Sequence, residues 1–299
     1  MGLFGYISLG SVSAVSLAGG EVTGKDNVGF LVGFVQGDIE TCTASGTVVG
    51  EKNVGGLVGN LYVASLTDSS ASGSVTATAS HGGGLVGEFF LGVGSGRHAS
   101  GAVSALSEVG GLIGMCSASP LERCYALGDV SGGGNLGGLV GSNTSNVTQC
   151  HAKGNVTGTG QEIGGLMGAN EGVVTECFAT GIVIGFDYVG GLLGVNRNTA
   201  TNSYAVGSTT ADNTVGGLVG YNDDTISECY AAGPVTGDSL TGGLVGVNDI
   251  SGTVGKSYWN TNTTGQMQSA GSPDSFGIET SVMRQEASFV DWDIDISTG

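Results

Sequence analysis

The sequence predicts an all-β fold, a parallel β-helix (β-solenoid) of about ten coils of 26–28 residues with a small C-terminal cap. Three observations predict it. A phrase centred on glycine and leucine recurs at nearly constant spacing. Between its copies, short runs rich in Val and Ile alternate with Gly, Asn, Asp and Thr, which is typical of strands and turns. Glycine supplies 60 of the 299 residues without a G-X-Y period, so tight turning explains it better than collagen does.

The repeat period can be measured on one anchor leucine per unit. Successive anchors are separated by 28, 26, 28, 27, 27, 27, 26, 26 and 26 residues. A unit of this length cannot bury its apolar face alone, so neighbouring units must stack on one another. The anchors are Leu3, Leu31, Leu57, Leu85, Leu112, Leu139, Leu166, Leu192, Leu218 and Leu244.

The segment around each anchor is apolar on both sides. If it is a straight strand, the leucine and the residue after it point to opposite faces, yet both are apolar in all units. A strand covered on both faces has this pattern. We therefore expect the segment to lie between layers. The alternative is an exposed apolar stripe from Val32 to Val245, which would be an association surface.

A second phrase after each later anchor indicates which side chains point inward. Residues 124–130 read CYALGDV and residues 150–156 read CHAKGNV. Alternate residues of a strand point to opposite faces. The Cys, Ala, Gly and Val positions share one small, apolar face, whereas the other face is mixed and polar. The small face is therefore predicted to be inside.

An asparagine follows the anchor by four residues in five units, and we expect these side chains to hydrogen-bond along the stack at a turn. They are Asn143, Asn170, Asn196, Asn222 and Asn248.

The pattern breaks near Trp259, which predicts a solenoid over residues 1–258 and a capping segment over 259–299. Thr280 or Ser281 is a suitable N-cap for a short helix over 282–287, and residues 289–294 read as a terminal strand. A larger, more aromatic tail suits a cap that covers an open sheet edge. The first coil has no such cap, from which we expect preceding residues or another chain to cover it.

The charge balance excludes several partner classes. Eight Lys and Arg residues oppose 26 Asp and Glu, for a net charge of −18. Binding to nucleic acid or to anionic lipid requires clustered cations, so neither is expected. No apolar run approaches the roughly 18 residues that cross a bilayer, so membrane insertion is not expected. The acidic composition suits an extracellular setting.

The repeated Gly-Gly-Leu-Val-Gly with a following Asn, and then Cys-Tyr-Ala-x-Gly-x-Val, resembles the GLUG motif repeat. The tail, with SYWNTNTTGQ and SFVDWDID, is similar as well. The resemblance implies a β-helix that occurs in large secreted or surface proteins of bacteria and archaea, among them adhesin-like proteins, as a stalk or passenger. It implies no catalytic residue. The units after Leu57 and Leu85 lack the Cys and depart from the pattern.

The six cysteines show no C-x-x-C spacing, so there is no zinc signature. Cys124, Cys150 and Cys177 fall on consecutive rungs inside the stack, which favours a buried row of free thiols. Cys116 and Cys124 flank one turn and are the candidate disulfide pair.

An aromatic row is predicted to face outward. The functional interpretation is a binding platform for sugar rings or for a protein partner, and the favoured alternative is mutual stacking that shields the strand hydrogen bonds. The row contains Tyr125, His151, Phe178, Tyr204, Tyr230 and Tyr258.

Metal and catalytic signals are weak. Asp291, Asp293 and Asp295 alternate, and Asp223 with Asp224 forms an acidic turn, but neither set has the Gly and distant Glu of a calcium loop. Solvated acidic side chains are the favoured interpretation, so no cofactor is expected and calcium is the alternative. No recognised nucleophile or zinc-protease motif occurs.

These observations favour a non-enzymatic structural or adhesive segment of a secreted or cell-surface protein, with an unidentified protein or glycan as its partner. One alternative is a β-helix protein that binds or cleaves polysaccharide. Another is a self-assembling surface filament that associates edge to edge through exposed strands.

Overall fold

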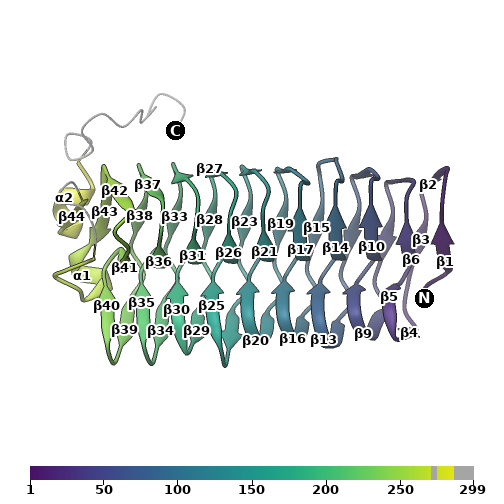
Figure 1. The fold of residues 1–299 in the computed structure, drawn as a ribbon, viewed down its shortest axis with the longest axis horizontal. Coiled ribbons are helices and arrows are strands. Elements are labelled where there is room, and N and C mark those ends of the chain that lie inside the picture. The colour runs from purple at the N-terminus through teal and green to yellow at the C-terminus, as the bar shows by residue number, and fades with distance from the viewer. Residues whose placement is uncertain (271–274, 286–299) are drawn as a thin grey trace.

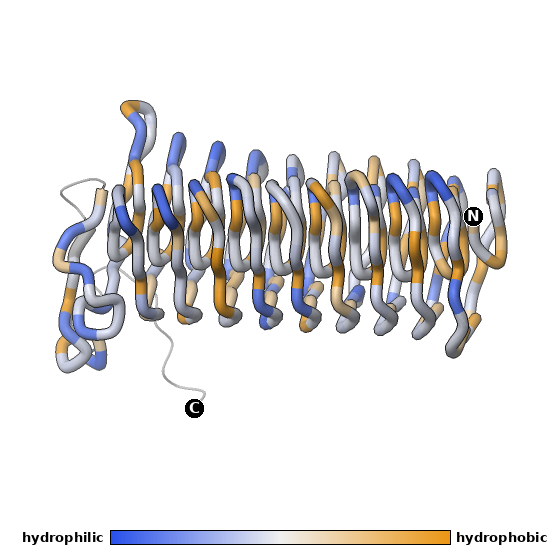
Figure 2. Tube along the Cα trace, turned by 90° about the horizontal axis from the view of Figure 1, so that it is seen from below, coloured by the Kyte–Doolittle hydropathy of each residue, from blue (hydrophilic) through white to orange (hydrophobic). Residues whose placement is uncertain are grey.

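Successive repeats stack along one axis, so the chain forms a rod with the first coil at one end and two short helices at the other (Figure 1). The computed structural model describes residues 1–270 and 275–285. Within them every strand pair is parallel, and the strands occupy four sheet positions that recur along the stack. In the coil after Leu85 the second position holds only the isolated bridge between Val93 and Ser65. Figure 2 shows the coils as separate, evenly spaced loops, with hydrophilic residues at the projecting bends of several coils. The predicted all-β solenoid is therefore confirmed.

The first sheet holds the strand that directly follows each anchor leucine. Its ten strands in the described residues make nine full turns from the first to the last. They are β1 (Phe4–Ile7), β6 (Val32–Val35), β10 (Val58–Tyr62), β14 (Val86–Phe90), β17 (Ile113–Ser117), β21 (Val140–Asn143), β26 (Met167–Asn170), β31 (Leu193–Asn196), β36 (Val219–Asn222) and β41 (Val245–Asn248).

The second sheet position is occupied by short strands in two separate groups. The first group contains β2 (Ser11–Ser13), β7 (Asp38–Glu40) and β11 (Leu66–Thr67). The second contains β18 (Leu121–Glu122), β22 (Val147–Thr148), β27 (Val174–Thr175), β32 (Ala200–Thr201), β37 (Thr225–Ser227) and β42 (Thr253–Gly255).

The third sheet carries the Tyr-Ala dipeptides of the second repeated phrase. Its strands are β3 (Ser16–Leu17), β8 (Thr43–Ala44), β12 (Ser70–Ala71), β15 (His98–Ala99), β19 (Tyr125–Ala126), β23 (His151–Ala152), β28 (Phe178–Ala179), β33 (Tyr204–Ala205), β38 (Tyr230–Ala231), β43 (Ser257–Asn260) and β44 (Ser275–Ile278).

The fourth sheet closes each coil and leads to the next anchor leucine. One row contains β4 (Glu21–Thr23), β9 (Thr47–Gly55), β13 (Val75–Gly83), β16 (Val103–Gly110), β20 (Val130–Gly137), β24 (Val156–Gly158), β29 (Val183–Gly185), β34 (Thr209–Ala211) and β39 (Val235–Gly237). A second row contains β5 (Asp26–Gly29), β25 (Gln161–Gly164), β30 (Asp187–Gly190), β35 (Thr214–Gly216) and β40 (Leu240–Gly242), and the long strands β9, β13, β16 and β20 span both rows.

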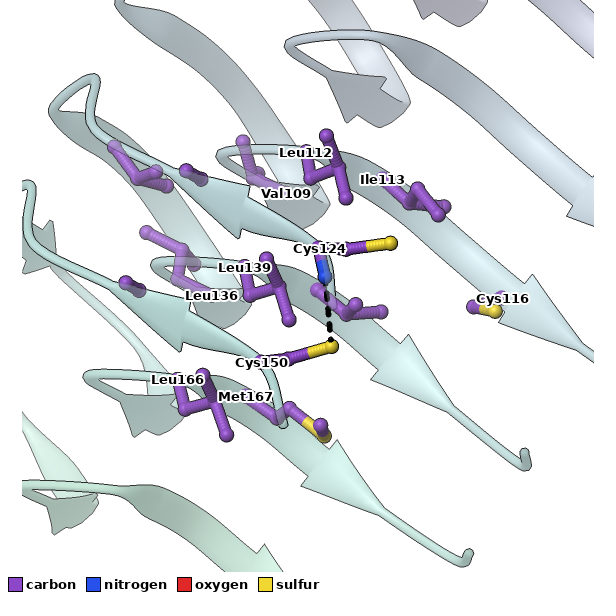
Figure 3. Close-up of a cluster of buried hydrophobic side chains, with 14 of the residues drawn as sticks. Val109, Leu112, Ile113, Cys116, Cys124, Leu136, Leu139, Cys150, Leu166 and Met167 are labelled. Carbon is purple, nitrogen blue, oxygen red and sulfur yellow. Dashed lines mark hydrogen bonds between the residues drawn. The ribbon is translucent and has the colours of Figure 1, made fainter. Parts of the chain in front are cut away.

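The anchor leucines from Leu31 to Leu244 and the residues that follow them are all buried in one continuous core. This confirms that the anchor segment is covered, but the geometry differs from a flat strand. The chain bends at the Gly-Leu pair between the fourth and first sheets, as at Gly165 and Leu166. Because of the bend, Leu166 and Met167 both reach the core rather than opposite faces (Figure 3).

Glycine at the anchor segment lets two backbones touch. A Cβ atom on Gly194 would lie 2.5 Å from the amide nitrogen of Ile163 and 2.6 Å from the carbonyl oxygen of Gly168. Any side chain here would therefore collide with the backbones of the coils below. This close approach explains why the repeated motif around the anchor leucine has glycine rather than alanine at this position.

Each coil also turns at residues with a left-handed backbone. One set, which we call the bend row, lies in the fourth sheet with φ between 50° and 61° and contains Asn27, Asn53, His81, Glu108, Asn135, Glu162 and Tyr188. Asn tolerates this conformation better than most residues, because its short side chain can hydrogen-bond locally. The row has one residue in each of these coils, so its side chains lie next to one another along the stack, beside the first sheet.

The last described residues close the stack. Trp259 is buried and its Nε1 donates to the carbonyl oxygen of Gln266, after the short helix α1 (Thr261–Thr264). Helix α2 spans Thr280–Met283 with Glu279 as its N-cap residue, so the helix predicted from 282 begins earlier, and Thr280 and Ser281 lie inside it. Among the described residues no helix has the length and apolarity to cross a membrane. The terminal strand predicted over 289–294 lies outside the described residues.

Candidate binding surface and internal ladders

The asparagine row forms the predicted hydrogen-bonded ladder inside the rod. Each side-chain Nδ2 donates to the Oδ1 of the next coil: 3.0 Å from Asn143 to Asn170, 3.1 Å from Asn170 to Asn196, 2.9 Å from Asn196 to Asn222 and 2.7 Å from Asn222 to Asn248. The same Nδ2 atoms also donate to a backbone carbonyl oxygen at the following turn, as from Asn143 to Ser145. The ladder therefore ties coil to coil and also holds each turn.

A second internal ladder runs through the cysteine position of the repeated phrase. The thiol or hydroxyl hydrogen donates to the carbonyl oxygen two residues earlier, at 2.7–3.3 Å. The sulfur or oxygen accepts the backbone N–H of the ladder residue one coil before, as where Cys150 Sγ lies 3.3 Å from Cys124 N (Figure 3). The buried row contains Cys42, Ser69, Arg97, Cys124, Cys150, Cys177, Ser203, Cys229 and Ser257.

The prediction of a buried row of free thiols is confirmed, but these thiols do more than fill space. They need a group that both donates and accepts, which is why Ser replaces Cys in three coils while Ala does not. Burial raises the pKa of Cys229 to about 12, and the hydrogen bond with Cys150 and burial raise the pKa of Cys124. The protonated thiol is the form that can donate, and it is a poor nucleophile.

Arg97 is the exception in this row. Its side chain is fully buried, its Nη2 donates to the carbonyl oxygens of Gly94 and Pro120, and its guanidinium lies 4.9 Å from the centre of the Phe89 ring. An arginine side chain has no hydrogen-bond acceptor, so it cannot accept the backbone N–H of the ladder residue in the preceding coil, and the ladder is interrupted there.

The predicted disulfide between Cys116 and Cys124 is wrong, because both are free thiols in the described structure. They occupy different ladders. Cys116 pairs in register with Asn143 at the asparagine position, and its Sγ donates to the carbonyl oxygen of Ser119. Burial raises the pKa of Cys116 to about 12. Cys124 instead belongs to the thiol row and donates to Glu122.

Substitutions at Cys150 test the ladder role. We expect Cys150→Ser to stay close to wild type, because serine keeps both the donor and the acceptor. Cys150→Ala leaves the buried Cys124 N–H without its acceptor and removes one of the two hydrogen bonds to the Thr148 carbonyl oxygen, which keeps the Arg123 N–H. It should lower the free energy of unfolding by about 1–3 kcal/mol. Urea denaturation of the three proteins measures this. Equal losses for Ser and Ala would mean that only sulfur packing matters.

The outward aromatic row stacks on itself, as the favoured interpretation expected. From His98 to Tyr230 each ring lies 4.7–5.2 Å from the next with interplanar angles of 2–9°. The members are His98, Tyr125, His151, Phe178, Tyr204 and Tyr230; sequence reading missed His98 because its coil lacks the cysteine phrase. Tyr258 pairs in register with Tyr230 but is only 7% exposed. The rings occupy one another's faces, so sugar rings could meet only their edges.

A second, looser aromatic row lies on the first sheet near the N-terminal end. Ring centres are separated by 5.4 Å between Tyr6 and Phe34, 6.3 Å between Phe34 and Tyr62, and 5.2 Å between Tyr62 and Phe90. The adjacent corner exposes Leu9 (87%) and Val93 (60%). The corresponding corner of later coils carries Glu171, Arg197 and Asp223 instead. At the same corner of the last coil Ile250 is fully exposed, so apolar residues occur at both ends of this flank.

The calcium candidates do not form a site in the described residues, where no group of three or more His, Cys, Asp or Glu side chains is placed to hold a metal. Asp223 accepts the hydroxyl of Ser251, and Asp224 accepts the hydroxyl of Thr225 at 2.9 Å. Asp291, Asp293 and Asp295 lie outside the described residues.

Three segments of the chain match the family model of the GLUG motif, at residues 50–76, 132–157 and 211–236. The chain contains GLUG motifs. Each match covers one complete coil, from the fourth sheet through the anchor leucine and the first three sheets to the fourth sheet again. Searches of curated proteins and of solved structures return no match. GLUG repeats and a β-solenoid fold fit a structural or adhesive repeat protein.

Proposed function

We propose that this chain is a non-enzymatic structural and adhesive segment of a secreted or cell-surface protein. It acts as a stiff rod that projects or presents another domain, and its repetitive flank makes weak multivalent contacts. The observation that carries the proposal is the pair of internal ladders. Their hydrogen bonds join most coils to the next coil, in addition to the hydrogen bonds of the sheets that surround the core.

The stiffness follows from the pairing of the coils. Parallel strands of the first, third and fourth sheet positions join neighbouring coils along the rod, so bending it would break hydrogen bonds on one side and compress the other. At about 4.8 Å per coil, the ten coils extend roughly 45 Å. Such a segment sets a fixed separation between whatever lies at its two ends.

The adhesive part of the proposal rests on repetition. Each outward position recurs once per coil, so a partner with a matching repeat can make several weak contacts at once. A glycan or a protein would both serve as this partner. Because the aromatic ring faces are stacked on one another, contacts on the third sheet would use ring edges and the neighbouring polar side chains, such as Gln149 and Glu176.

Distances between spin labels test the rod. Thr23, Thr157 and Thr236 lie in one row of the fourth sheet, separated by five and then three coil steps, and all are exposed. Labels on Cys at 23 and 157 should be about 24 Å apart, and labels at 23 and 236 about 38 Å, both with narrow distributions. The native cysteines are all buried. A broad distribution for the longer pair alone would contradict a stiff rod.

The non-enzymatic part needs its own test. The protein is incubated with a panel of acidic and neutral polysaccharides, and cleavage is measured as a decrease in polysaccharide length and as new reducing ends. In parallel, binding of the protein is measured on the same polysaccharides after immobilisation and on extracellular matrix proteins. Binding without cleavage supports the proposal. Cleavage of any polysaccharide would replace the proposal with the enzymatic alternative. If the protein bound none of the surfaces, the adhesive role would be refuted and only the role of a spacer would remain.

A further inference from the structure

A polar cluster is buried where the bend row of the fourth sheet meets the first sheet, near the N-terminal end of the rod. Asn53, His81 and Glu108 come from consecutive coils of the bend row, and Asn60 and Glu88 come from β10 and β14. Asn53 and His81 are only 7% and 8% exposed. Neither ladder nor any outward row uses these groups, so they need a separate explanation.

The orientation of the Asn53 amide is fixed by its surroundings. Its Nδ2 lies 2.8 Å from Glu88 Oε2 and 2.9 Å from Asn27 Oδ1. The carboxylate of Glu88 can only accept, so the amine end of the Asn53 amide must face it. The oxygen end of Asn53 then faces His81 Nδ1, at 2.6 Å. Since an amide oxygen can only accept, Nδ1 of His81 must carry a hydrogen.

The other ring nitrogen of His81 faces a carboxylate. His81 Nε2 is in direct contact with Glu108 Oε2. A neutral ring that already has its hydrogen on Nδ1 would turn a bare lone pair toward that oxygen, which is repulsive. The contact therefore requires one additional proton between Nε2 and Oε2. A ring N–H that donates to a carboxylate forms a charge-assisted hydrogen bond, so we assign that proton to Nε2 of the ring. This hydrogen bond lowers the pKa of the Glu108 carboxyl.

We propose that His81, Asn53 and Glu108 form a proton-binding site that clasps successive coils to one another when the imidazole is doubly protonated. The charged groups around the ring are Glu108 on β16, Glu88 on β14 and Lys52 on β9. The imidazolium contacts the Glu108 carboxylate directly, and the Asn53 amide connects it to the Glu88 carboxylate. Loss of the second proton of the ring leaves the Nε2 lone pair against the Glu108 carboxylate and removes this attraction.

The sign of the pH dependence follows from the two partners. On the alkaline side, removal of the proton between Nε2 and Oε2 removes the contribution of the clasp. On the acid side, the lowered pKa of Glu108 means that its contribution is present above its unfolded-state pKa of about 4.3 and is lost as the pH falls through the folded value. The clasp is complete only between these limits.

Glu108→Gln is the matched test, because it keeps the size of the side chain. Glutamine can donate its amide hydrogen to Nε2 of a neutral imidazole, so the network stays closed without the extra proton. We expect the melting temperature of the wild-type protein to fall by roughly 3 °C or more between pH 7 and pH 9, and that of the Gln variant to change much less. An equal fall in both proteins would overturn the proposal.

The ¹⁵N shifts of the His81 ring give a direct readout, and the wild-type measurement does not depend on whether the variant folds. At pH 7 they should be those of an imidazolium in the wild type. In the Gln variant they should be those of a neutral ring with its hydrogen on Nδ1. His98 and His151, in the outward aromatic stack, serve as internal comparisons. A neutral His81 ring in the wild type at pH 7 would refute the assignment.

Discussion

Gly194→Ala is expected to destabilise the rod strongly. The added Cβ would lie 2.5 Å from Ile163 N, 2.6 Å from the Glu162 carbonyl carbon and 2.6 Å from Gly168 O. All three are backbone atoms in paired strands, which cannot rotate away as a side chain can. We expect a loss of about 3 kcal/mol or more, measured by urea denaturation and by recovery of soluble protein.

Gly255→Ala is the matched control. Gly255 is also in a strand, β42, but a Cβ there meets no atom within 4 Å. Its free energy of unfolding should stay within about 0.5 kcal/mol of wild type. If both variants behaved alike, the close approach of backbones at the anchor segment would not be what selects glycine there.

Asn196→Leu should produce the second large effect. The Asn196 side chain is fully buried, its Nδ2 donates to Asn222 Oδ1 at 2.9 Å and to the carbonyl oxygen of Asn198, and its Oδ1 accepts from Asn170 at 3.1 Å. Leucine has a similar volume but removes the donor from Asn222 Oδ1 and from the Asn198 carbonyl oxygen, whereas Asn170 Nδ2 keeps its bond to the Gly172 carbonyl oxygen. Each unsatisfied buried group costs about 1–3 kcal/mol, so a total loss of about 2–4 kcal/mol is expected.

The exposed Asn213, in the same part of the rod, provides the comparison. Asn213→Leu makes the same chemical change at the surface and should alter the free energy of unfolding by at most about 0.5 kcal/mol. Thermal and urea unfolding of both variants give the measurement. A ladder variant as stable as its surface counterpart would show that the asparagines stack without contributing to stability.

Much of the fold could be predicted because each repeat has the same length and the same pattern of apolar residues. The spacing of the leucines from Leu31 to Leu244 gave the coil length, and the alternation of Cys, Ala and Val in the second phrase gave the inner face. The asparagine row could be placed for the same reason, since identical residues at one period must stack. Alternation is a local property of strands, so it is visible without coordinates.

What could not be predicted depends on bends and on contacts across coils. Leu166 and Met167 both point inward because the chain turns at Gly165, and alternation counts assume a straight strand. The pairing of Cys116 with Asn143 follows from register, not from its distance in sequence to Cys124. His81 and Glu108 are unlike residues in one row, so their contact carries no repeat signal.

The hydrogen bonds that nitrogen atoms donate in the two ladders run in one direction. The donor nitrogen belongs to the earlier coil and the acceptor to the later one, from Cys124 to Cys150 and from Asn143 to Asn170. The units that carry both the Asn and the Cys or Ser position therefore offer their neighbours the same interface. An in-frame gene duplication of one unit, such as residues 166–191, would add about 4.8 Å of length without requiring any new kind of contact. Length in such a protein is a modular trait, which evolution can change by copying rather than by redesign.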